Sequence, residues 1–247
     1  MEHAIVLKPE VLGYIGFLPV TNTLLVSWIV MFVLIAISIA ATTRLKIIPS
    51  GLQNFMEFII EGGYTMVEDL AHSRAKMFFP FVMTFFLYII VANWIGLFPG
   101  FTTIGFNTEE HGEYIFVPLL RGVNSDLNMT LALALVSAAA THFFAIKYLG
   151  ILDYLKRWVS LNPIFLFVGL LEIISEFTKI LSLSFRLFGN IFAGEVVLAT
   201  IAGIFAFVLP LPFYGLEIVV GFVQAAVFMM LTLVFMVLLS EKHGEEH

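Results

Sequence analysis

Six ionisable side chains lie inside the last two long apolar stretches of this sequence. Four are acids and two are bases: Glu172, Glu176, Lys179, Arg186, Glu195 and Glu217. If these stretches cross a membrane, each charge costs at least about 2.5–3.5 kcal/mol on insertion scales, and such residues usually mark ion or substrate pathways. We therefore expect the C-terminal third of the chain to carry the function.

Arg186 is the most informative of the six, because a carboxylic acid or a lysine can lose its charge when desolvated and a guanidinium effectively cannot. It lies 24 residues before Pro210, far from either end of its stretch. It is therefore a permanent positive charge at membrane depth, and the alternative role is a salt bridge that holds helices together. Lys179 either extends toward the cytoplasm or pairs with Glu176 or Glu172.

Helical spacing groups several of these side chains. Glu172, Lys179 and Arg186 are seven residues apart and share a helix face, and Asn190 follows one turn later on the same side. Glu195 lies nine residues beyond Arg186, about 13 Å further along the axis. Acids on both sides of one fixed cation suit two separate aqueous entrances with a positive barrier between them.

The final stretch adds Glu217 near its expected outer end and Gln224 two turns deeper. In an antiparallel hairpin, Glu217 is level with Glu195, and Gln224 with Arg186, if the turn is centred at position 205 or 206. The prolines that follow Leu209 instead predict a turn nearer position 211. The two helices are then expected to slide or tilt by more than a turn.

Composition supports a membrane setting for these charges. Of 247 residues, 60% are hydrophobic and 12% charged, against about 45–50% and about 25% in soluble domains. The formal charge of -6 leaves no basic surface for nucleic acid. The absence of cysteine excludes disulfides and cysteine-bound metals, and no cofactor or metal site is expected.

The fold class expected is an all-α polytopic membrane protein, organised as a single membrane domain with five membrane-crossing helices. A span needs about 20 mostly apolar residues. The expected elements are a first span at 24–42, an amphipathic surface helix at 50–73, spans at 77–98 and 129–148, and a tilted helical hairpin at 163–240 that carries the ion pathway.

The stretch from Pro163 to Leu209 is unusually long. Its 47 residues would extend about 70 Å as one helix, more than twice the thickness of a ~30 Å hydrocarbon core. Its likely breaking points, the glycines at 189, 194 and 203, are single residues, and no proline or glycine-rich turn divides it. We favour one long tilted helix, with an ordinary two-span hairpin as the alternative.

Basic residues predict the orientation. With the N-terminus outside and five crossings, Lys8 and Arg121 are the only basic residues outside, and eight fall on the cytoplasmic side: Arg44, Lys46, Arg74, Lys76, Lys147, Lys156, Arg157 and Lys242. This places the C-terminus in the cytoplasm. The surface helix at 50–73 has an apolar stripe and an acidic opposite face, which suits either a protein partner or a solvated linker.

His142 is the one histidine expected inside a span, which argues against a bis-histidine haem site. We interpret it as a polar residue that faces the helix bundle, with a proton relay as the alternative.

Three motifs resemble subunit a of rotary F-type ATP synthases. The run SLSFRLFGNIFAGE at 182–195 closely resembles the signature of that family, QAAVFMMLT at 224–232 resembles its final-helix motif, and DLNMTLALA at 126–134 resembles the start of its central span. The resemblance extends over nearly the whole chain. It implies a non-catalytic stator subunit beside a rotating ring of c subunits, each of which carries one membrane carboxylate.

By similarity, Arg186 matches the essential arginine that faces the ring. The residues assigned to the proton pathway are Glu195, Glu217, Asn190 and Gln224 on the outer side, and Glu172 with Lys179 toward the cytoplasm. The implied partners are the c-subunit ring, the peripheral stalk b subunits, the remainder of the ATP synthase and the lipid bilayer, and no nucleic-acid partner is expected. The expected location is the bacterial plasma (inner) membrane. Some family members pair an acid with a histidine where this chain has Glu195 and Glu217.

Two other functions remain open from the residues alone. A secondary ion-coupled transporter would bind substrate at the buried charges, but internal repeats and broken helices are then expected, and neither is clear. A structural subunit of a respiratory membrane complex would use Arg186 in a salt bridge.

Overall fold

The computed structural model describes residues 9–98, 100–110, 113–158, 163–204 and 208–241. Within these ranges the chain forms α1 (Asn22–Thr42), α2 (Leu52–Ala71), α3 (Ala75–Gly96), α4 (Leu127–Leu149), α5 (Ile151–Trp158), α6 (Pro163–Ile204) and α7 (Pro210–Ser240). Five stretches are long and apolar enough to cross a membrane, α2 and α3 being counted as one of them. The prediction of a polytopic helical membrane protein is confirmed.

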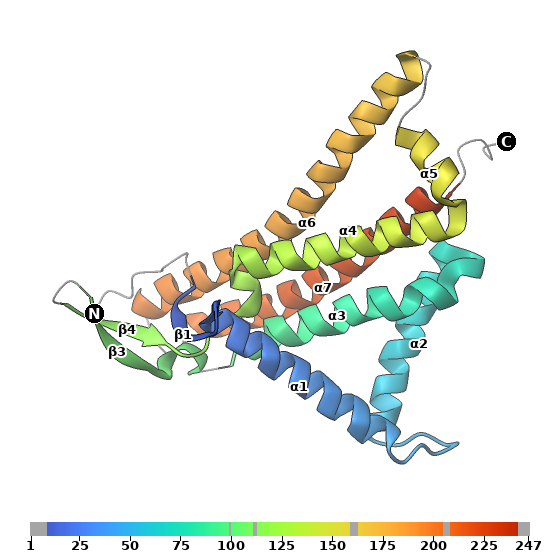
Figure 1. The fold of residues 1–247 in the computed structure, drawn as a ribbon. Helices are drawn as coiled ribbons and strands as arrows, with labels where there is room; N and C mark the ends of the chain where they lie inside the picture. Colours follow the sequence, from blue (N-terminus) through green and yellow to red (C-terminus); the bar gives the residue numbers. More distant parts are fainter. Residues whose placement is uncertain (1–8, 99, 111–112, 159–162, 205–207, 242–247) are drawn as a thin grey trace.

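The long apolar stretch forms one continuous helix. α6 contains 42 residues, or about 63 Å at 1.5 Å per residue, and its single glycines do not interrupt it. Figure 1 shows its N-terminal part leaning away from α4 and its C-terminal part lying alongside the other helices. The alternative of two ordinary spans within this stretch is therefore wrong.

The expected position of the turn after α6 was also wrong. α7 begins at Pro210, which occupies the first turn of the helix. Proline is tolerated there because the first backbone N–H groups of a helix have no partner within the helix. The prolines therefore start α7 rather than form the turn, and Glu195 and Glu217 come level without the extra slide.

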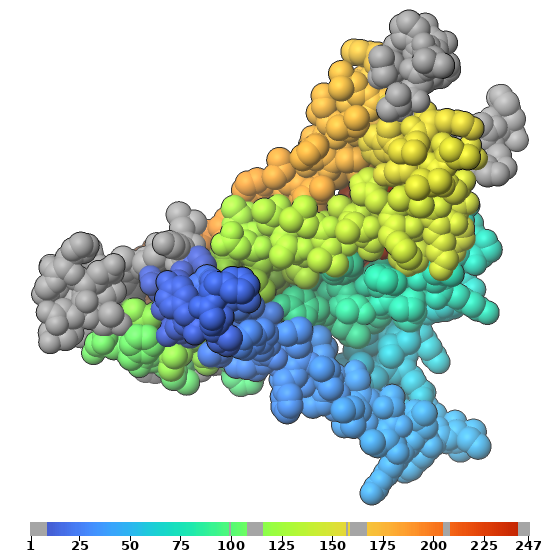
Figure 2. Space-filling view, viewed as in Figure 1, coloured from blue at the N-terminus to red at the C-terminus, as the bar shows by residue number. Residues whose placement is uncertain are grey.

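The helices α3, α4 and α7 lie side by side, and the ends of this bundle differ (Figure 1). At one end, α2 and α5 link the long helices, while α1 and the N-terminal part of α6 spread outward. Figure 2 shows the same spreading outline in space-filling form. The other end carries two β-hairpins. Lys8 and Lys242, used to predict orientation, lie outside the described residues.

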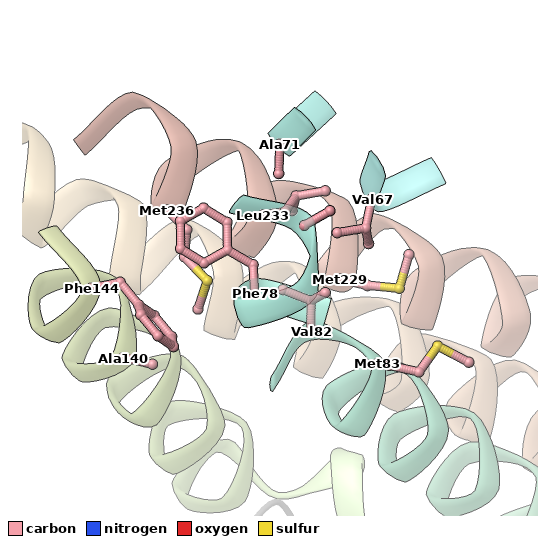
Figure 3. Close-up of a cluster of buried hydrophobic side chains, with 11 residues drawn as sticks. Val67, Ala71, Phe78, Val82, Met83, Ala140, Phe144, Met229, Leu233 and Met236 are labelled. Carbon is pink, nitrogen blue, oxygen red and sulfur yellow. The ribbon is translucent and has the colours of Figure 1, made fainter. Parts of the chain in front are cut away.

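A buried apolar cluster joins four of the helices (Figure 3). It contains Val67 and Ala71 of α2, residues of α3 and α4, and Met229, Leu233 and Met236 of α7. Phe78 of α3 packs edge-on against Phe144 of α4, with 5.2 Å between the ring centroids. The C-terminal half of α2 is thus packed against the bundle through Val67 and Ala71.

Two helix caps anchor the opposite end. The Thr21 hydroxyl accepts a hydrogen bond from Leu24 N at the start of α1, and the Asp126 carboxylate accepts one from Asn128 N at the start of α4. Such caps satisfy N–H groups that the helix itself leaves unpaired. The Thr23 hydroxyl also donates to Asp126 Oδ2 at 2.8 Å, so the two helix starts are tied together.

The hairpins were not predicted. β1 (Val11–Ile15) pairs with β2 (Leu18–Thr21), and β3 (Gly105–Glu110) pairs with β4 (Glu113–Pro118), both antiparallel. The first turns at Gly16, whose φ of 65° suits glycine. Short strands outside the spans give little hydropathy signal, and the second hairpin lies between the spans expected at 77–98 and 129–148.

Candidate functional site

Arg186 lies on an open side of α6. Its neighbours Leu183, Ser184 and Leu187 are buried, and the Ser184 hydroxyl is 3.1 Å from that of Thr130 on α4. The Arg186 side chain itself is exposed, and its Nη2 lies 3.5 Å from Ser182 Oγ on the same helix. No described carboxylate forms an ion pair with it, which argues against a salt bridge between helices of this chain.

A groove of about 420 Å³ runs along α6 and α7 beside this arginine. Its polar lining comes from α6: Ser175, Thr178, Lys179, Ser182 and Arg186. Leu231 and Phe235 contribute the α7 wall. The other four polar residues all precede Arg186 along α6. The groove therefore leads from the arginine toward the end of the bundle where α5 lies.

Lys179 contacts an acid on its own helix and an aromatic ring on α7. Its Nζ lies 2.6 Å from Glu176 Oε1 and 5.0 Å from the centre of the Phe235 ring. His142 of α4 places Nε2 at 3.8 Å from Glu176 Oε2, and its Nδ1 is 3.0 Å from the hydroxyl of Tyr154 on α5. Of the two expectations for Lys179, the ion pair with Glu176 is the one observed, and His142 contacts two neighbouring helices.

Glu195 and Glu217 come together on the other side of Arg186. The Glu217 side chain is 7% exposed and packs directly against Gly194 of α6. Glu195, the next residue, packs against Gly122, which precedes the short helix η3 (Val123–Ser125). Both contacts depend on glycine, because a Cβ at either position would overlap the carboxyl group. Both glutamates line the same small cavity.

The buried segment before α4 completes this outer pair. Ser125 and Arg121 lie near enough to the Glu195 carboxyl group to act on it electrostatically, and the Ser125 hydroxyl donates to the Gly122 carbonyl at 2.9 Å. Arg121 and Ser125 are 9% and 0% exposed. The sequence placed Arg121 only on the outer side of the membrane, and the tertiary structure brings it to Glu195.

A small network of amides was also missed. Asn93 of α3 donates from Nδ2 to the Gly221 carbonyl of α7 at 3.0 Å, and it accepts at Oδ1 from Asn124 Nδ2 at 2.7 Å. Both asparagines line a cavity of about 20 Å³ together with Gly122, Glu195 and Glu217. The signal for Asn93 was available, because it is an amide inside an otherwise apolar span.

The remaining predicted residues line neither the groove beside Arg186 nor the cavity beside the outer glutamates. Asn190 is exposed on α6 one turn beyond Arg186, Gln224 is half-buried on α7, and Glu172 is half-buried on the N-terminal part of α6. None of the three lines the groove or the cavity. Among the described residues, no group of three His, Asp or Glu side chains could hold a metal ion.

The fold and these groups define an integral membrane protein with an unpaired arginine between a buried pair of acids and an open polar groove. Such an arrangement handles ions at membrane depth. Its long, uninterrupted α6 is unlike the broken helices typical of secondary transporters.

Comparison with known proteins agrees with this class. The family model described as ATP synthase A chain matches residues 24–237. A protein of Geobacter sp. (strain M21) named ATP synthase subunit a is 36% identical over 231 residues, which cover 92% of this chain and 91% of the relative. ATP synthase subunit a 1 of Pelobacter propionicus is 37% identical over 213 residues, 85% of this chain and 83% of the relative. The chain belongs to the ATP synthase A chain family.

Family membership establishes the general function. The chain is a non-catalytic, proton-conducting stator subunit of an F-type ATP synthase. The expectation drawn from the motifs is therefore confirmed, and neither a secondary transporter nor a respiratory scaffold is favoured.

Proposed function

We propose that Arg186 separates two proton half-channels, one through Glu195 and Glu217 and the other through the groove that contains Lys179. The observation that carries this proposal is the exposed guanidinium, which has no ion pair among the described residues and lies between these two polar regions. A permanent charge in this position blocks direct passage of protons between the two paths.

The c-subunit ring is the proposed partner at the open side of α6. A ring carboxylate that arrives beside Arg186 is favoured in its ionised form by the adjacent positive charge. It releases its proton into the groove and is later reloaded from the outer pair of glutamates. Each charge that crosses 100 mV supplies about 2.3 kcal/mol, so several protons must cross for each ATP made.

The other assigned residues extend the two paths. Asn190 and Gln224 are proposed to lead from the outer glutamates toward the ring, and Glu172 to lie near the cytoplasmic exit beyond Lys179. Their positions on α6 and α7 fit this order along the chain. The exposed face of Asn190 also suits contact with the ring.

The N-terminus is proposed to lie outside and the C-terminus in the cytoplasm of a bacterial plasma (inner) membrane. The excess of basic residues predicted to be inside supports this orientation. Figure 1 places α2 and α5 at one end of the bundle and the hairpins at the other. Basic residues predicted to be inside lie in or next to α2 and α5, which agrees with a cytoplasmic position for that end. The peripheral stalk b subunits are the proposed partners of the acidic face of α2.

The test is ATP-driven proton uptake into inverted membrane vesicles that contain the whole complex. Arg186→Ala is compared with the native chain at equal assembly, and Lys156→Ala is the matched control, because Lys156 is a 75% exposed cation on α5. We expect Arg186→Ala to abolish coupled uptake and Lys156→Ala to retain it. Coupled uptake by assembled Arg186→Ala complexes at the native rate would reduce Arg186 to a structural role.

A further inference from the structure

The small cavity beside the outer glutamates contains an unsatisfied acceptor. Asn124 is 1% exposed, and its Nδ2 is used in the hydrogen bond to Asn93. Its Oδ1 is buried and has no hydrogen-bond partner among the described residues. An acceptor buried without a partner is costly, and in folded proteins it is commonly satisfied by an ordered water.

The size and lining of the cavity fit that role. Its volume of about 20 Å³ exceeds the 10–15 Å³ or so that one water requires. Asn93, Asn124, Glu195 and Glu217 all line it. One water there can find the two to four polar partners that an ordered water needs.

We propose that Asn124 holds a single water molecule in this cavity, and that this water relays protons to the paired carboxyl groups of Glu195 and Glu217. Asn93 orients Asn124 through the 2.7 Å hydrogen bond between their amides, which leaves Oδ1 to accept from the water. The water accepts a proton on one side and gives one up on the other, so no net charge stays in the cavity. This inference rests on the proposed outer half-channel and adds its narrowest step.

The test uses two substitutions of similar shape at one position. Asn124→Thr keeps a hydroxyl that can accept from the water and donate to Asn93, and Asn124→Val removes both possibilities. In ATP-driven proton uptake by the whole complex, we expect Asn124→Val to be about tenfold slower than native, as the loss of a buried hydrogen bond predicts. Asn124→Thr should stay within about twofold of native. Rescue by threonine distinguishes a water-holding role from simple packing.

The matched control is Asn128→Val, which makes the same change at an exposed position in the first turn of α4. It should leave uptake unchanged. Equal uptake by Asn124→Val and Asn124→Thr at equal assembly would overturn the proposal.

If Asn124→Val does not assemble, Gly122→Ala carries the test, because Gly122 lines the cavity and its added methyl group takes up the space of the water without altering the Asn124 side chain. Slow uptake in Gly122→Ala supports the relay, and native uptake contradicts it. Glu217→Gln separates the two levels of inference. If Glu217→Gln blocks uptake while Asn124→Val does not, the outer path stands and the water relay at Asn124 is refuted. If Glu217→Gln conducts normally, the proposed outer path itself is refuted.

Discussion

Gly194 should not tolerate even the smallest side chain. A Cβ built on it overlaps Cδ and both carboxyl oxygens of Glu217 on α7. The overlapped group is 7% exposed, so Glu217 has little room to turn away. In Gly194→Ala, we therefore expect either α6 and α7 to separate or the Glu217 carboxyl group to leave Glu195.

The expected magnitude follows from two opposing terms. Overpacking a filled site costs about 1–3 kcal/mol, whereas alanine is favoured over glycine inside a helix by about 1 kcal/mol. The net cost then lies between about 0 and 2 kcal/mol, and the burial of Glu217 places it in the upper half of that range. A cost of 1–2 kcal/mol lowers the population with Glu217 correctly placed by about 5- to 30-fold, and proton uptake should fall by a similar factor.

The assay is ATP-driven proton uptake at equal assembly, with Gly203→Ala as the control. Gly203 lies on the same helix, and a Cβ there meets nothing within 4 Å. Its alanine variant gains helix propensity without an overlap and should conduct at the native rate. If Gly194→Ala conducts as well as Gly203→Ala, the close approach of Glu217 to α6 cannot be what positions the outer pair.

Two further predictions concern the packing of the other elements. His142→Leu removes the 3.0 Å hydrogen bond to Tyr154 and the contact with Glu176, so amides of α5 should exchange hydrogen about fivefold faster, as the loss of about 1 kcal/mol implies; unchanged exchange would mean that α5 is held by other contacts. Phe78→Ala should destabilise the bundle by about 3 kcal/mol and lower the thermal midpoint of the solubilised complex. Phe32→Ala on α1, whose side chain is 72% exposed, should leave that midpoint nearly unchanged.

The positions of the spans were accessible from the sequence. A membrane-crossing helix must be long and apolar, and this requirement is local. The five apolar stretches and the unbroken length of α6 therefore followed from hydropathy and from the lack of a strong breaking signal. Arg186 was accessible for a related reason, because a guanidinium cannot lose its charge at membrane depth.

The hairpins and the start of α7 were less accessible. Short strands outside the membrane carry no comparable hydropathy signal, since only part of their surface is buried. Pro210 can end one element or begin the next, and its role depends on whether a helix follows it. In the sequence, the prolines favoured a turn, whereas in the structure Pro210 begins α7.

The sequence by itself determined which groups could not be ordinary membrane residues, because the cost of a charge in a span depends on its type and depth. Only the tertiary structure decided which of them meet. Glu195 and Glu217 come together because Gly194 and Gly122 allow close approach, and Asn124 joins them through a segment distant in sequence. Contacts of this kind depend on how separate helices pack, and spacing along the chain does not by itself fix that packing.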